Sequence, residues 1–315
     1  MTPTLSRLAH RTTFAAAAGF ACLGASATEG GGNTYPIGVE TNFPGFMLPE
    51  GLHVMTYYQH YSASHSKDGA GNDNQRLAYY KFNADVLAAR FSYVWPGVNW
   101  LGASVETRAV LSLPTLDLTL GVARKEPLGP LDRSGSRTAI GDFMLAPLLL
   151  GWHSDKLHQT FGIEGFLPTG SYDKGRPVNS GRNYWQLAVA YGATWFPIKE
   201  VDLSAKLRYA VNGRNRDTDY RSGNELSVEY SAGYRFSSAV AAGLSGYLYR
   251  QTTDDKQAGK LVNGDGNRGS VNAIGPYLTY SFSPKFTVTA KLQKEFGARN
   301  KAEGTRLWLQ ARVPF

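Results

Sequence analysis

The residues best suited to chemistry are ionised side chains that recur two or four positions apart within strand-like runs. Lys206 and Arg208 stand two apart, and Glu225 and Glu229 stand four apart. In a β-strand this spacing places each pair on one face. Guanidinium groups bind carboxylates or phenolates, and opposite charges also pair with one another. The set therefore either crosslinks a wall or lines a wetted, mildly anion-favouring passage; both interpretations share Glu106, Arg108, Asp202, Lys206, Arg208, Glu225, Glu229, Arg235, Lys291, Glu295, Arg306 and Arg312.

One aromatic residue belongs to the same face. Trp308 has the parity of Arg306 and Arg312. A tryptophan beside arginines either stacks on a flat ring or fills space, and the sequence does not separate these roles.

The sequence offers little support for hydrolytic or metal-dependent chemistry. It contains no G-x-S-x-G motif, no His pair with zincin spacing, and a single cysteine, Cys22. A Ser–His pair assembled across strands stays open, because neighbours in space cannot be read from one strand. We predict no catalytic residues, metal or cofactor, and keep a lipid-modifying enzyme as an alternative.

The last stretch of the chain, residues 304–315 (GTRLWLQARVPF), indicates which element positions these side chains. Leu307, Leu309 and Val313 share one parity, and Arg306 and Arg312 share the other. A period of two with one apolar face is typical of a β-strand between two different environments. A closed barrel in a membrane can end this way, because its last strand pairs with its first. The alternative is the last strand of a secreted β-sandwich.

Similar strand-like runs fill the chain from residue 51 onward, separated alternately by short and long connections. The pattern predicts an all-β, transmembrane up-and-down antiparallel β-barrel of about twelve strands, with both termini on the periplasmic side. The predicted strands are 51–61, 79–95, 99–112, 139–152, 157–168, 184–196, 200–212, 223–236, 238–252, 270–283, 284–297 and 304–315. The predicted short connections are 96–98, 153–156, 197–199, 237 and 283–284, and the long ones are 62–75, 113–138, 169–183, 213–222, 253–269 and 298–303.

The faces of these strands follow from the cost of charge in lipid. An Arg or Lys facing lipid at the midplane costs roughly 2–4 kcal/mol, so the charged parity must face the lumen. A change of parity between Ala88 and Phe91 predicts a bulge, and residues 139–152 are apolar on both parities. Rings near strand ends are expected to form interfacial belts: Trp95, Trp100, Trp152, Trp185, Trp195 and Tyr249.

The length and composition of the chain agree with an exported barrel. The chain has 315 residues with 12% aromatic residues and a mean hydropathy of −0.30. Beyond the N-terminus no run approaches the ~20 apolar residues of a membrane helix. The net charge of +8 is scattered, which disfavours nucleic acid as a partner.

Residues 1–27 have the organisation of a cleaved signal peptide. Arg7 and Arg11 precede a short apolar core, and small residues at 25–27 predict a mature chain beginning at Thr28. A lipoprotein signal at Cys22 is the alternative, although the residues before it form a poor lipobox.

Several motifs along the mature chain resemble an outer-membrane family named for the MetA pathway of phenol degradation. They are TEGGGNTYPIGVETNF (28–43), DFMLAPLLLGWH (142–153), FLPTGSYDKGR (166–176), GRNYW (181–185), NGRNRDTDYRSGNE (212–225), GYRF (233–236), GNRG (266–269) and EFGARN (295–300), with Phe315. The resemblance implies an outer-membrane β-barrel associated with aromatic degradation, and it supplies no catalytic residues.

The Gly-rich stretch between the signal and the first strand resembles a hallmark of that family. We predict that residues 28–50 form a plug within a barrel made by residues 51–315, because glycine allows close approach to the wall. The predicted plug residues are Glu29, Gly30, Gly31, Gly32, Tyr35 and Pro36. An ordered lid outside the pore is the alternative.

These observations predict an outer-membrane channel for passive uptake of small hydrophobic or aromatic compounds, such as phenolics and aromatic acids. Its expected partners are outer-membrane lipid and lipopolysaccharide, the solute, and the barrel-assembly machinery through Phe315. A structural or surface-interaction barrel is the second alternative.

Overall fold

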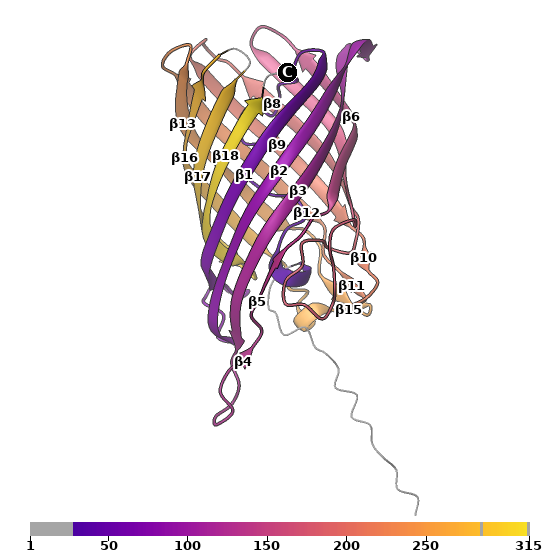
Figure 1. Ribbon diagram of the computed structural model, residues 1–315, viewed down its shortest axis with the longest axis vertical. Helices are drawn as coiled ribbons and strands as arrows, with labels where there is room; N and C mark the ends of the chain where they lie inside the picture. The colour runs from indigo at the N-terminus through magenta and orange to yellow at the C-terminus, as the bar shows by residue number, and fades with distance from the viewer. Residues whose placement is uncertain (1–27, 284–285, 314–315) are drawn as a thin grey trace, which may run out of the picture.

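The computed structural model describes residues 28–283 and 286–313, and its main feature is a closed antiparallel barrel (Figure 1). The described residues contain no helix that is long and apolar enough to cross a membrane, only the short 3-10 turns η1 (Glu29–Gly31) and η2 (Val262–Gly264). The twelve strands of the wall are β1 (Gly51–Ser66), β2 (Leu77–Trp100), β3 (Ala103–Val122), β6 (Phe143–His153), β7 (Leu157–Leu167), β8 (Gln186–Trp195), β9 (Val201–Asn212), β12 (Glu225–Arg235), β13 (Val240–Gln251), β16 (Ser270–Ser281), β17 (Thr287–Arg299) and β18 (Ala302–Val313).

The barrel closes through its first and last strands. β1 pairs antiparallel with β18, from Val54 opposite Val313 to Ser66 opposite Ala302. β2 pairs with both β1 and β3, so the wall has no free edge. Closure gives every wall strand a hydrogen-bonding partner on both sides, which a membrane requires. The predicted fold class is confirmed.

The connections distinguish two ends of the barrel (Figure 1). The short-turn end carries the tight turns, for example residues 154–156 between β6 and β7. The long-loop end carries the small strands β4 (Leu131–Asp132), β5 (Gly135–Thr138), β10 (Arg214–Asn215), β11 (Tyr220–Arg221), β14 (Lys256–Gln257) and β15 (Lys260–Leu261). β10, β11, β14 and β15 pair with one another in a separate sheet.

Four predicted connections were wrong. Residues 62–66, predicted as loop, belong to β1, which ends at Ser66. The β2–β3 turn is Leu101–Gly102 rather than 96–98, because β2 continues past Pro96 to Trp100. Residues 113–122, predicted as loop, extend β3, where Leu116 and Leu118 alternate with polar residues. Residues 298–303 are not a long loop, because only 300–301 separate β17 from β18.

The predicted bulge in β2 is also wrong. Residues 82–94 keep an unbroken register against both β1 and β3, so no residue is inserted between Ala88 and Phe91. The register shifts of β2 lie near its ends instead, at Leu77–Tyr79 and Val94–Asn99 against β3, and β6 has a shift of its own between Leu145 and Leu148 against β7.

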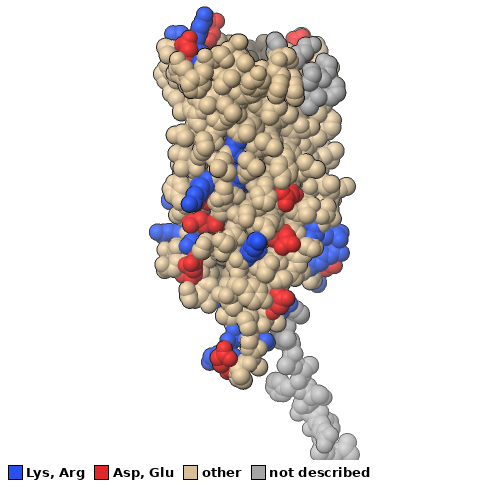
Figure 2. All heavy atoms as spheres, turned by 60° about the vertical axis from the view of Figure 1, so that its left-hand side comes forward, with Lys and Arg blue, Asp and Glu red and all other residues tan. Residues whose placement is uncertain are grey.

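The two faces of the wall differ in the way the sequence pattern indicates. On β9 the even residues from Asp202 to Asn212 are buried, while Leu203 and Leu207 are exposed on the outside. On the face drawn in Figure 2, the upper part of the wall below the rim carries almost only uncharged side chains, and charges gather at the rim and in the lower half. Trp95, Trp100, Trp185 and Trp195 are exposed, as outward-facing belt residues must be, but Tyr249 is buried.

Residues 28–50 cross the interior of this barrel from one end to the other. Thr28 contacts Asp255 in the connection after β13, at the long-loop end. Phe46 stacks on His158 beside the turn between β6 and β7, at the short-turn end. The ends of the wall itself, Gly51 and Val313, both lie at the short-turn end, but Thr28 lies at the opposite end, so the expectation that both termini share one side fails for the N-terminal segment.

The outward face of β9 gives a test of the membrane orientation. Leu207→Arg should lower the free energy of unfolding in phospholipid vesicles by about 2–4 kcal/mol, because it exposes a guanidinium to lipid. Urea titration measures the loss, and Leu261→Arg in the exposed β15 serves as the matched control. Equal stability of the two variants would show that Leu207 does not face lipid.

Candidate functional site

The predicted lumen residues lie on five strands of the wall, β3, β9, β12, β17 and β18. Glu106, Arg108, Asp202, Lys206, Arg208, Glu225, Glu229, Lys291, Glu295 and Trp308 are buried, and Arg306 and Arg312 are half-buried. Arg235 has the same parity but is exposed at the short-turn end of β12. Several of them contact the N-terminal segment: Arg108, Lys206, Arg208, Glu229, Lys291 and Arg306.

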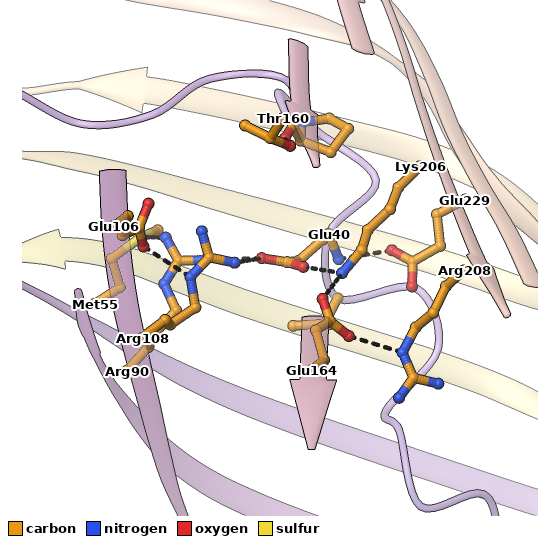
Figure 3. A network of polar contacts seen from close by, with 12 residues as sticks. Glu40, Met55, Arg90, Glu106, Arg108, Thr160, Glu164, Lys206, Arg208 and Glu229 are labelled. Atoms are coloured by element: carbon orange, nitrogen blue, oxygen red, sulfur yellow. Dashed lines mark hydrogen bonds and ion pairs between the residues drawn. The ribbon is translucent and has the colours of Figure 1, made fainter. Parts of the chain in front are cut away.

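Glu40 is the point where the segment and the wall are most strongly joined (Figure 3). Its Oε1 lies 2.9 Å from Nη1 of Arg90 on β2 and 2.7 Å from Nη1 of Arg108 on β3. Its Oε2 pairs with the ammonium of Lys206 on β9. One carboxylate therefore bridges two separate parts of the wall, and this places the segment within the lumen.

A second carboxylate completes this network from the wall. Glu164 on β7 lies 2.6 Å from Nζ of Lys206 and 2.7 Å from Nε of Arg208. The guanidinium of Arg208 lies 4.4 Å from the ring centroid of Tyr35. Glu106 accepts a 2.9 Å hydrogen bond from Nε of Arg108. Positive and negative groups thus alternate around the segment, and each buried charge in this network has a partner of opposite sign, as burial requires.

The backbone of residues 37–41 also takes its hydrogen bonds from wall side chains. Glu229 accepts from the backbone N–H groups of Gly38 at 3.0 Å and Glu40 at 2.7 Å. Lys291 donates to the carbonyls of Gly38 at 2.7 Å and Val39 at 2.8 Å. An irregular chain at membrane depth has no strand neighbour, so these bonds replace those of a sheet.

Gly38 shows why glycine is needed at this depth. Its φ is +92°, and a Cβ there would lie 2.4 Å from Oε1 of Gln293 and 3.0 Å from the ring of Tyr247. Any other residue at this position would have a strained backbone, and its side chain would clash with the wall.

The predicted plug residues at the long-loop end have partners in the loops. Arg182 donates to the carbonyls of Glu29 at 3.4 Å and Asn33 at 3.2 Å, and lies against Gly30 and Gly32. Nζ of Lys301 donates to the carbonyl of Gly31 at 3.3 Å.

Glu29 itself is bound by loop side chains. Its carboxylate accepts from Asn215 at 2.8 Å and from Thr218 at 2.5 Å. Burial raises the pKa of Glu29, and these two hydrogen bonds oppose the rise. Farther along the segment, Pro36 closes a turn, since its carbonyl accepts from the N–H of Val39 at 3.2 Å.

Tyrosines on the inner wall form a further group. Glu295 accepts from the hydroxyls of Tyr61 at 2.7 Å and Tyr247 at 2.5 Å. The guanidinium of Arg306 lies 4.8 Å from the ring centroid of Tyr61. The ring of Trp308 lies 5.6 Å from Nζ of Lys291. These contacts put rings and cations side by side in the lumen.

Sequence reasoning missed Glu40, Arg90, Glu164 and the inward orientation of Tyr249. Glu40 is the only acidic residue between Glu29 and Glu50, which is the signal that would have singled it out within the segment. Arg90 was obscured by the supposed bulge in β2.

Comparison with known proteins identifies the family. The sequence profile of the family described as "Putative MetA-pathway of phenol degradation" matches residues 65–311. The chain belongs to this family. No curated protein matches the chain.

Solved structures were compared with this family member. The COG4313 outer membrane channel from Pseudomonas putida F1 is 14% identical, with 87% of this chain and 98% of that chain covered and a TM-score of 0.74. The CymD monoaromatic hydrocarbon channel is 10% identical over 85% of this chain and 89% of that chain, with a TM-score of 0.48. The NanC porin is 12% identical over 84% of this chain and all of that chain (100%), with a TM-score of 0.44. The first of these shows that the fold is that of an outer-membrane β-barrel.

The three ion pairs of Glu40 lead to a test of how the segment is held. Glu40→Gln removes the ion pair of Arg90 and one of the two ion pairs made by Arg108 and by Lys206, and removing one partner of a buried pair costs about 3–5 kcal/mol. The amides of residues 37–41 should then exchange with deuterium about tenfold faster or more, as read by mass spectrometry in detergent. Glu50→Gln is the control, because Glu50 is exposed and accepts from the N–H of Gly97. Unchanged exchange in Glu40→Gln would mean that these pairs do not hold the segment.

Proposed function

We propose that the protein is an outer-membrane channel for passive uptake of small hydrophobic or aromatic compounds, with phenolics and aromatic acids as the solute class. Family membership and the barrel fold support this proposal. Hydrophobic solutes cross a lipopolysaccharide leaflet poorly, so a protein path has a use.

The observation that carries the solute class is the pairing of rings with cations inside the wall. Cations lie over the rings of Tyr35, Tyr57, Tyr61 and Trp308, at 4.4–5.8 Å from the ring centroids. A cation over a ring face is stabilised by the ring quadrupole, and a guanidinium also binds a carboxylate. A small aromatic acid presents both a ring and a carboxylate, so it can replace the contacts that the segment makes.

In this proposal residues 28–50 are a displaceable plug rather than a lid outside the pore. The segment is bound by ion pairs and hydrogen bonds, which water and a polar solute group can substitute one by one, and by apolar contacts of Tyr35, Ile37 and Met47, which a hydrophobic solute can substitute. The inner residues Lys206, Arg208, Glu229, Lys291 and Arg306 then have two roles: they hold the plug at rest and line the path when it moves.

Export and assembly complete the proposal. Residues 1–27 act as the signal peptide, and Phe315 is read by the barrel-assembly machinery; both lie outside the described residues. The exposed apolar wall contacts outer-membrane lipid and lipopolysaccharide. A similar solved structure is an outer membrane channel, and we propose transport without catalysis.

Liposome swelling tests the solute class. Purified protein in phospholipid vesicles should admit benzoate and 4-hydroxybenzoate several-fold faster than a pentose, because the sugar has neither a ring face nor a carboxylate to bind. Vesicles without protein give the background.

Each alternative gives a different result in the same preparation. Equal entry of the pentose would indicate a general porin and contradict the aromatic preference. Release of fatty acid from labelled phospholipid would indicate a lipid-modifying enzyme. No entry of any solute, with the folded barrel present, would indicate a structural role.

A further inference from the structure

Asp255 is a fully buried carboxylate in the connection between β13 and β16. Its Oδ1 accepts from the backbone N–H of Gly223 at 2.7 Å and from Nε2 of Gln251 at 2.6 Å. Its Oδ2 accepts from the hydroxyl of Tyr220 at 2.6 Å and from the nitrogen of Thr28 at 2.9 Å. Every donor around it is neutral when Thr28 is joined to a preceding residue.

No Lys, Arg or His in the described part of the chain forms an ion pair with Asp255, in contrast to neighbouring Asp254, which pairs with Arg268 at 2.6 Å. A buried charge without a counter-ion is costly. Burial raises the pKa of Asp255, and its hydrogen bonds only oppose that rise. A positively charged donor in place of one of these neutral donors would therefore stabilise the ionised form of Asp255.

Thr28 supplies a second, independent observation. Its backbone has φ +63° and ψ 150°, a region that is essentially restricted to glycine and strained for a β-branched residue. The angle φ is defined by the carbonyl carbon of the preceding residue. The strain therefore exists only while residue 27 is attached, and it disappears if the chain begins at Thr28.

We propose that removal of residues 1–27 makes the new α-ammonium of Thr28 the counter-ion of Asp255, and that this ion pair anchors the N-terminal segment at the long-loop end. A peptidase that removes signal peptides from exported proteins hydrolyses the peptide bond between residues 27 and 28. The C–N bond breaks, the water oxygen stays on Ala27 as a carboxylate, and both water protons go to the nitrogen of Thr28. The neutral hydrogen bond to Asp255 becomes a charge-assisted one, which is roughly twice as strong.

With this ion pair, both ends of residues 28–50 are fixed. One end of residues 28–50 is covalently joined to β1 at the short-turn end. The other end would be fixed by the ion pair at Asp255, with the N–H of Glu29 donating to Ser222 at 3.2 Å beside it. The segment then spans the lumen between two fixed points, and the anchor forms only in the processed chain. It does not depend on which solute passes.

The test is the reactivity of the N-terminal amine in the exported, folded protein. Intact mass should first show a chain that begins at Thr28. At pH 8, 2-pyridinecarboxaldehyde, which reacts with α-amines, should then label the wild type about tenfold or more slowly than it labels Asp255→Asn, which is isosteric but uncharged. Asp265→Asn, on the same connection, is the matched control and should label like the wild type.

A second measurement needs only the wild type. The labelling rate of the folded protein, followed against pH, should rise at a higher pH than that of the urea-unfolded protein, whose α-amine titrates near about 7.7–8.0. The groups facing this amine are Asp255 and Tyr220, followed by Glu29; Arg182 and Lys301 bind carbonyls farther along the segment. A mature start at another residue, equal labelling of wild type and Asp255→Asn, or coincident pH profiles would each overturn the proposal.

Discussion

The constraint on which the structure depends is that every backbone polar group at membrane depth must find a partner within the protein. The wall meets it by closing β1 on β18. The segment 28–50 cannot meet it that way, because it runs irregularly through the lumen. Its needs are met by side chains of the wall, above all Glu229 and Lys291, which bind the backbone of residues 38–40. Charged side chains on the inner face of the wall therefore bind the backbone of an irregular segment, in addition to forming ion pairs with one another.

This arrangement bears on transport. Tyr35, Ile37 and Met47 of the segment are buried in an apolar cluster with wall residues, and water cannot replace these contacts. Ion pairs such as Glu40 with Arg108 do have aqueous substitutes. Removing Glu40 from the network leaves Arg108 with Glu106 and Lys206 with Glu164, so the wall retains partners for these two cations. If the segment moves as we propose, Arg108 and Lys206 keep these partners, and Arg90 loses its ion pair with Glu40. The same cations lie beside the rings that we propose an aromatic solute contacts.

The sequence was sufficient for the barrel, its twelve strands and the direction of the charged parity, because period-two alternation and the cost of charge in lipid act locally along each strand. It was insufficient where a partner far away in sequence decides. β3 continues to Val122 because β2 pairs with it that far, and Tyr249 turns inward beside Lys301. Glu40 has three cationic partners on β2, β3 and β9, and none of these is a neighbour in sequence. The direction of residues 28–50 across the lumen likewise depends on the loops that receive Thr28.

The central claim is that residues 28–50 occupy the conducting path. Single-channel recording in planar bilayers of protein lacking residues 28–45 tests it most directly. The account predicts a conductance several-fold above that of the wild type, because the deletion empties the lumen of the segment while β1 to β18 stay intact. A folded deletion variant with the conductance of the wild type would contradict it.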